Sequence, residues 1–106
     1  LRRALEIAML GDMLEAAEAE RIGLINRVLP ADALAGEAMA LAQRLANGPT
    51  VALGQLRRLM RGSFERELPA QLAAESAAFQ VCAASQDFRS GVDAFFAKKP
   101  ARFEGR

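Results

Sequence analysis

The residue types present in this sequence limit the chemistry that it can perform. Histidine, tyrosine and tryptophan are absent from the 106 residues, and Cys82 is the single cysteine. Ser-His-Asp and Cys-His arrangements are excluded, because both need an imidazole as the base. A zinc site built on a cysteine pair is excluded as well. A lone cysteine forms no internal disulfide, and the default expectation is a reducing, cytoplasmic setting.

The thirteen acidic residues are the remaining candidates for acid or base catalysis. Most of them fall on the polar faces of expected helices or at helix starts, where a solvated charge is the simpler interpretation. The eight glycines occur singly, so the sequence contains no glycine-rich phosphate-binding loop. Cys82 lies beside an apolar stripe, which favours a small buried thiol over a reactive one. The residues alone therefore indicate a helical body without a self-contained active site.

Composition and charge are those of a globular protein, with 52% hydrophobic and 25% charged residues. The formal net charge of +1 gives no electrostatic argument for binding nucleic acid or an anionic membrane. No uncharged apolar run reaches the roughly 18 to 20 residues that span a bilayer, and no signal peptide is recognisable. Because the sequence opens on Leu1 instead of methionine, we expect further residues upstream.

The spacing of hydrophobic residues predicts an all-α chain with about six helices and one short extended segment. The helices are expected at residues 2–10, 15–22, 32–46, 50–61, 68–84 and 86–98, and the extended segment at residues 24–29. Asp32 and Ser85 are the expected N-caps of the third and sixth helices. Pro49 and Pro69 suit the first turns of the fourth and fifth helices.

The hydrophobic core is expected to be thin for a chain of this length. Much of the hydrophobic content is alanine, which removes little apolar area from water when it is buried. The fourth expected helix, for example, has only Leu53, Leu56 and Met60 to bury on its apolar stripe. Such a body would gain stability by docking against another surface.

Several short motifs follow one another along the chain. They are Arg3-Ala4-Leu5-Glu6 with Met9-Leu10-Gly11-Asp12, Ala16 and Ala19, Gly23-Leu24-Ile25-Asn26-Arg27-Val28, Asn47-Gly48-Pro49, Ser85-Gln86-Asp87 with Gly91-Val92 and Ala94-Phe95, and Lys98-Lys99-Pro100 with Arg102-Phe103 and Gly105-Arg106. In order and spacing these motifs resemble the crotonase family of enoyl-CoA hydratases and isomerases, over essentially the whole chain. The resemblance implies the C-terminal helical (trimerisation) part of a crotonase-like fold. Residues 1–30 would be the end of the crotonase core, and residues 31–106 the C-terminal helical oligomerisation region.

The resemblance implies a parent enzyme, a lyase or isomerase of fatty acid metabolism, that acts on acyl-CoA thioesters through an enolate intermediate. In this family the oxyanion-hole N–H groups and the proton-transferring carboxylate come from a preceding spiral of ββα turns. This piece would then hold no catalytic residue and be inactive alone. It would supply homo-oligomer contacts, in a trimer or a dimer of trimers, and part of the CoA site. Coenzyme A would enter as part of the substrate, with no tightly bound cofactor.

Two positions match family residues that contact CoA. Phe79 matches an aromatic residue that lies against the adenine, and Lys98 matches a lysine that approaches the phosphates, commonly from a neighbouring subunit. An aromatic face stacks on a purine, and an ammonium group is a point charge for phosphate. Structural roles stay open for both, since Phe79 lies on an apolar stripe and Lys98 lies where the helix dipole favours a cation. Lys99 and Arg102 are further candidates for contacts to phosphate.

Two alternatives come from other classes of protein. A non-catalytic helical interaction or oligomerisation module needs no active site, and alanine-rich stripes suit helix–helix packing. A small helical nucleic-acid-binding protein is disfavoured, because the arginines are scattered and the net charge is close to zero. Within the resembling family, the choice between hydratase and isomerase and the acyl chain accepted depend on residues outside this chain. The stretches Met9-Leu10-Gly11 and Pro49-Thr50 through Leu53-Gly54 resemble the phenylacetate-pathway isomerases.

The isolated chain is predicted to self-associate. Helices that would normally dock against a larger core present apolar faces to water, and exposed apolar patches favour assembly. Size-exclusion chromatography with light scattering at micromolar concentration measures this directly. A compact monomer under those conditions would contradict the prediction.

Overall fold

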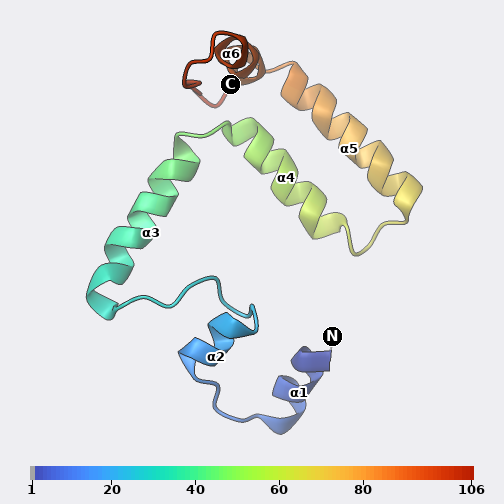
Figure 1. Cartoon of the computed structure of the whole chain (residues 1–106). Helices are drawn as coiled ribbons and strands as arrows, with labels where there is room; N and C mark the ends of the chain where they lie inside the picture. Colours follow the sequence, from blue (N-terminus) through green and yellow to red (C-terminus); the bar gives the residue numbers. More distant parts are fainter. Residues whose placement is uncertain (1) are drawn as a thin grey trace. The chain divides into compact units, whose positions relative to one another are not determined.

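The computed structural model describes residues 2–106 and is all-helical over that range, as the sequence predicts (Figure 1). The helices are α1 (Arg2–Leu10), α2 (Ala16–Arg21), α3 (Ala31–Ala46), α4 (Thr50–Gly62), α5 (Leu68–Ala83) and α6 (Gln86–Phe96). The described residues contain no strand, and none of their helices is long and apolar enough to cross a membrane. Two compact units divide the chain, one up to Gly36 and one from Glu37 to Arg106.

The first unit ends its short helix α2 with a glycine turn. Gly23 has a φ of +77° and donates its N–H to Glu20, while Leu24 donates to the carbonyl of Ala19. This pair of bonds is the Schellman motif, in which a left-handed residue satisfies the last helical carbonyls. Ile25 also donates to Ala19. Residues 24–26 therefore form bends. The extended segment that the sequence predicts at residues 24–29 does not include these first three residues.

The start of α3 differs from the sequence prediction. Asp32 lies inside the first turn of the helix and is not its N-cap. The carbonyl of Pro30 instead accepts the N–H groups of Ala33 and Leu34, at 3.0 and 3.1 Å. Proline suits the beginning of a helix because it has no N–H to satisfy and its φ is already fixed near the helical value. Asp32 still favours the helix, since a carboxylate in the first turn interacts well with the dipole.

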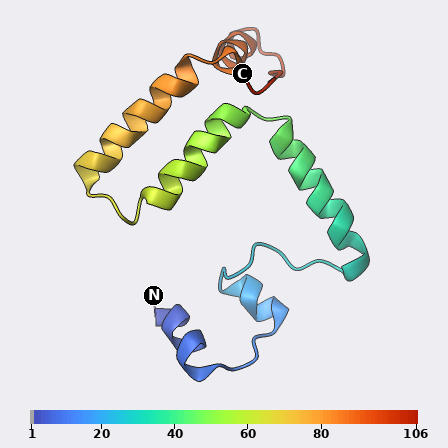
Figure 2. The ribbon, with the colours of Figure 1, turned by 180° about the vertical axis from the view of Figure 1, so that it is seen from behind.

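In the second unit, α4 lies beside α5, and α5 packs against α6 (Figures 1 and 2). Pro49 occupies the N-cap position of α4, one residue before the place expected for it, and its carbonyl accepts the N–H of Leu53 at 3.0 Å. Pro69 lies in the first turn of α5, as expected. Ser85 caps α6 as predicted, with Oγ accepting the N–H of Phe88 at 3.1 Å.

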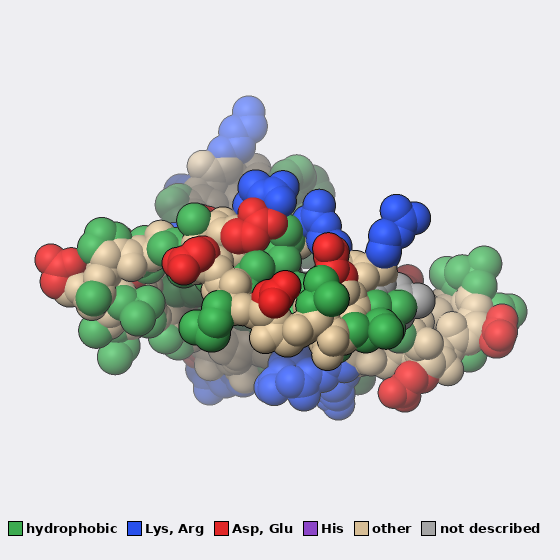
Figure 3. All heavy atoms as spheres, turned by 90° about the horizontal axis from the view of Figure 1, so that it is seen from below, with side chains coloured by type: hydrophobic (Ala, Val, Ile, Leu, Met, Phe, Trp, Pro, Cys, Tyr) green, Lys and Arg blue, Asp and Glu red, His purple; other side chains and the backbone are tan. Residues whose placement is uncertain are grey.

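Few side chains are buried in either unit. Among the described residues, Ala19 and Ala78 are the buried hydrophobic ones. Leu56 and Met60 of α4, expected to be buried, are 55% and 62% exposed. Figure 3 shows hydrophobic side chains lying at the surface among charged ones. The exposed area is 9126 Å², whereas two compact bodies with the sizes of these units would expose roughly 7,000 Å².

Replacing Ser85 with alanine is predicted to destabilise the second unit. The substitution removes the oxygen that satisfies a terminal N–H of α6, and we expect the free energy of unfolding to fall by about 1 kcal/mol. Urea unfolding followed by circular dichroism measures the change. Ser90→Ala, at an exposed position of the same helix, is the control and should alter stability by less than about 0.5 kcal/mol. Equal losses in the two variants would rule out the capping role.

Candidate functional site

The candidate site lies at the end of the second unit, where α5, α6 and the C-terminal tail meet. Phe79 on α5 packs edge-to-face against Phe88 in the first turn of α6, with ring centroids 6.0 Å apart and planes at 89°. This is a favourable aromatic geometry. Phe79 is nevertheless 61% exposed. Phe88 therefore contacts part of the ring, and much of the ring stays accessible to a partner.

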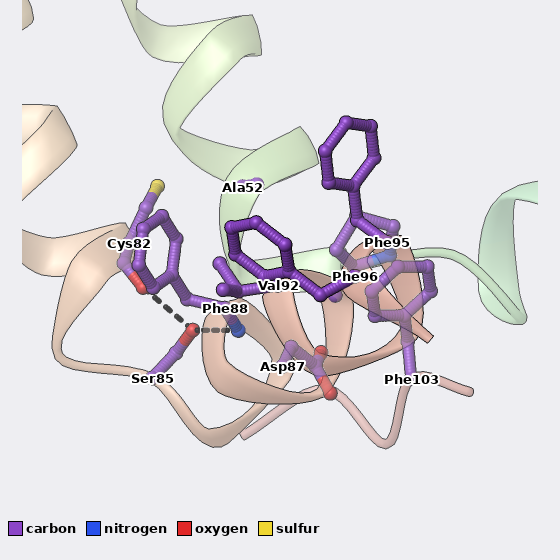
Figure 4. A pocket seen from close by; sticks show the side chains of 11 residues that line it. Ala52, Cys82, Ser85, Asp87, Phe88, Val92, Phe95, Phe96 and Phe103 are labelled. Atoms are coloured by element: carbon purple, nitrogen blue, oxygen red, sulfur yellow. Dashed lines mark hydrogen bonds between the residues drawn. The ribbon is translucent and has the colours of Figure 1, made fainter. Parts of the chain in front are cut away.

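An apolar cavity of about 500 Å³ opens beside this aromatic pair (Figure 4). Its lining comes from α4, α5, α6 and the tail: Pro49, Ala52, Cys82, Ser85, Asp87, Phe88, Gly91, Val92, Phe95, Phe96 and Phe103. Ser85 is already engaged, since its Oγ donates to the carbonyl of Cys82 and accepts from Phe88. Cys82 is only partly buried there, whereas the sequence predicts a small buried thiol. The cavity is suited to holding apolar groups, and the carboxylate in its lining, that of Asp87, is bonded to the backbone of the tail.

Asp87 is the buried charged residue of this region, with only 3% of its surface exposed. Its Oδ1 accepts the N–H of Glu104 at 2.7 Å, and its Oδ2 accepts the N–H of Gly105 at 2.9 Å. The N–H of Asp87 in turn donates to the carbonyl of Arg106 at 3.0 Å. Both carboxylate oxygens are thus hydrogen-bonded to the backbone of the tail. The sequence did not predict this contact, although the motif of Asp87 and the motif of the tail both belong to the family resemblance.

Lys98 lies just beyond the C-terminal end of α6 in a left-handed conformation, with a φ of +53°. Its N–H donates to the carbonyl of Phe95, and the N–H of Lys99 donates to that of Ala94. These bonds form the same Schellman motif that ends α2, but α2 uses Gly23 where α6 uses a lysine. A left-handed conformation costs a residue with a Cβ roughly 1–2 kcal/mol.

The cations of the tail are available for a ligand. Lys98, Lys99 and Arg102 are exposed, and none of them has an ion-pair partner within the described part of the chain. Phe88, the partner of Phe79, lies in the first turn of α6, and Lys98 follows the last turn. The helix rises about 12 Å between Phe88 and its last residue, Phe96. Phe88 and Lys98 therefore belong to opposite ends of α6.

The carboxylate with a displaced pKa belongs to the first unit and has a local explanation. The guanidinium of Arg21 donates two hydrogen bonds to Glu18 one helical turn away, and this lowers the pKa of Glu18 from its ordinary value. The same contact raises the pKa of Arg21. The pair is solvent-exposed, so it is a surface ion pair and not a catalytic acid. No group of three His, Cys, Asp or Glu that could hold a metal ion occurs among residues 2–106.

Comparison with known proteins relates the whole chain to one family. The family model described as "Enoyl-CoA hydratase/isomerase" matches residues 1–106. The chain is 36% identical over 106 residues to a "Probable enoyl-CoA hydratase" of Rhodobacter capsulatus, covering 100% of this chain and 41% of that protein. It is also 36% identical over 104 residues to 1,2-epoxyphenylacetyl-CoA isomerase of Escherichia coli, covering 98% and 40% of the two chains.

Solved structures give the same relationship. An enoyl-CoA hydratase subunit I from Geobacillus kaustophilus has a TM-score of 0.93 to this chain at 35% sequence identity, with 100% of this chain and 41% of that chain covered. The crystal structure of enoyl-CoA hydratase from Mycobacterium tuberculosis has a TM-score of 0.85 at 28% identity, with 99% and 42% covered. The chain thus spans about 40% of the length of the relatives that it matches.

Proposed function

The chain belongs to the enoyl-CoA hydratase/isomerase family, and we propose that it is the C-terminal helical region of an enzyme acting on acyl-CoA thioesters through an enolate intermediate. In this proposal the region supplies subunit contacts and part of the CoA site, and the catalytic groups come from the rest of the enzyme. The observation that supports this proposal is that the family match extends over all 106 residues while covering about 40% of each relative.

The uncovered hydrophobic side chains support a role in subunit contacts. Leu56 and Met60 line an apolar groove of about 550 Å³ along α3 and α4, and Phe95 and Phe96 on α6 are 78% and 79% exposed. Exposed apolar surface of this kind is characteristic of protein–protein contact sites. We propose that a homo-oligomer, a trimer or a dimer of trimers, covers part of it.

The proposed CoA contacts are made by the exposed ring of Phe79 and the cations that follow α6. A purine stacks on an aromatic face, and Phe79 offers ring surface for this because it is 61% exposed. The CoA phosphates carry negative charge, and Lys98 presents an ammonium group without a competing carboxylate among the described residues. Lys99 and Arg102 would add charge to the same contact. Phe88 and Lys98 belong to opposite ends of α6, which rises about 12 Å from Phe88 to Phe96, and this suits an extended ligand.

The test of this function is an assay of the complete gene product that contains this chain. We expect it to add water to an enoyl-CoA thioester or to shift the double bond, followed by loss of the conjugated thioester absorbance. The chain of residues 1–106 alone, at equal concentration, is the matched control and should be inactive. A complete product that encodes nothing upstream and leaves enoyl-CoA unchanged would instead support the non-catalytic helical interaction module.

Two substitutions of Lys98 separate its charge from its backbone conformation. Lys98→Ala and Lys98→Gly both remove the ammonium group, so each is expected to weaken CoA binding about tenfold, measured by calorimetry on the complete gene product. Their stabilities should differ, because glycine relieves the left-handed strain that alanine keeps, by about 1 kcal/mol. Arg89→Ala, which removes an exposed cation from α6, is the control and should leave affinity unchanged. If the CoA affinities of the two variants differ in the same way as their stabilities, the proposed contact of the Lys98 ammonium group is wrong.

The ring of Phe79 is tested with an apolar replacement. Phe79→Leu keeps hydrophobic volume but removes the stacking face, and we expect CoA affinity to fall about fivefold or more. Phe64→Leu removes a ring that is 96% exposed outside the candidate site and serves as the control. Unaltered CoA affinity in Phe79→Leu would leave Phe79 with a purely structural role.

A further inference from the structure

The C-terminal tail is fixed at both of its ends by α6. At the C-terminal end of the helix, the Schellman bonds of Lys98 and Lys99 turn the chain back on itself. At the N-terminal end of the helix, the carboxylate of Asp87 accepts the N–H groups of Glu104 and Gly105. The tail therefore returns along the helix that precedes it, and the cations of residues 98–102 lie in the segment between the two fixed points.

One glycine allows the tail to lie close to α4. The ring of Phe103 packs over Gly91 of α6 at a distance that would leave an added Cβ in ordinary contact, 3.5 Å from the ring. Gly105 has a φ of +77°, and a Cβ there would lie 2.7 Å from Oγ1 of Thr50 at the start of α4. Only glycine fits this position, both for its conformation and for its space. The tail is thus held against α4 as well as α6.

Asp87 is better suited to this role than a surface carboxylate. It is 3% exposed, so its charge has left water, and the hydrogen bonds from Glu104 and Gly105 replace the lost hydration. Hydrogen bonds between an ionised carboxylate and backbone N–H groups are stronger than neutral ones. Its own N–H, a terminal donor of α6, is satisfied by the carbonyl of Arg106. Three bonds therefore join one residue to three consecutive positions of the tail.

We propose that Asp87 is a positioning residue for phosphate binding, which holds the segment of Lys98, Lys99 and Arg102 in its binding conformation by fixing the returning tail. The inference rests on the proposed CoA contact of Lys98. Its physical basis is preorganisation: a segment held at both ends loses less conformational freedom when its cations bind an anion. Asp87 itself bears a negative charge, yet its burial and its hydrogen bonds to the tail keep it from competing as a partner for those cations.

The decisive variant is Asp87→Ala in the complete gene product. It leaves two N–H groups of the tail without their acceptor, and we expect amide exchange at Glu104 and Gly105 to accelerate and CoA binding to weaken about tenfold. KM for the CoA substrate should rise while kcat changes little, because the reacting thioester is not bound by the tail. Asp93→Ala removes the same charge from an exposed position of α6 and should change none of these quantities.

A second variant acts on the tail without altering α6. Gly105→Ala introduces a Cβ that meets Thr50, and it should release the tail and weaken CoA binding to the same degree as Asp87→Ala. Asp87→Asn keeps one acceptor oxygen and should give an intermediate effect. In a protein that already carries Lys98→Ala, the Asp87→Ala change should reduce CoA affinity by a smaller factor than it does alone. One of the cations that Asp87 positions is then already absent.

The outcomes distinguish this inference from the function on which it rests. If Lys98→Ala leaves CoA binding unchanged, the proposed CoA contact fails. If Lys98→Ala weakens binding, but Asp87→Ala and Gly105→Ala free the tail amides without changing CoA affinity, the contact stands and the positioning role is overturned. A rise in KM that is shared by Asp87→Ala and Gly105→Ala, and absent in Asp93→Ala, supports the inference.

Discussion

The shortage of side chains that can be buried is the constraint on which the rest of this structure depends. Alanine provides much of the hydrophobic content, and the buried hydrophobic residues among the described ones are two alanines, Ala19 and Ala78. A helix pair held by alanine gains little from the hydrophobic effect, since each methyl group removes little area from water. Larger side chains such as Phe95 and Phe96 are present but remain at the surface. The helices are therefore suited to completing a larger body, as expected for a chain that spans about 40% of its relatives.

Polar contacts supply the local order that a thin core does not. Ser85 begins α6, the Schellman bonds at Lys98 end it, and Asp87 returns the tail to its first turn. Each of these contacts satisfies backbone groups that a helix end would otherwise leave without a partner. Because they lie within one helix and its flanking residues, they can hold the α6 region in a defined conformation even where little apolar area is buried.

The sequence predicted the features of this fold that depend on neighbouring residues. The bounds of α1 and the Ser85 cap follow from helix propensity and cap chemistry, which act over a few positions. Asp32 was expected to cap α3, but the carbonyl of Pro30 begins the helix one residue earlier. The contact of Asp87 with the tail joins residues 17 and 18 positions apart. Periodicity carries no information on such a pairing, and an acid near a helix start has a sufficient local explanation in the dipole.

The Schellman motifs after α2 and α6 differ in the residue that adopts the left-handed conformation, which is Gly23 in the first and Lys98 in the second. At Gly23 the left-handed conformation has no Cβ to accommodate, whereas at Lys98 it carries a cost of about 1 kcal/mol or more. The helix dipole favours a cation near this end, but Lys99, the next residue, could supply that charge with a glycine at position 98. Local energetics therefore favour glycine, and a lysine there is consistent with an ammonium group that is needed at this point of the surface. A tail fixed at both ends gives that group a defined position, so the CoA contact that we propose would explain both the left-handed conformation of Lys98 and the burial of Asp87.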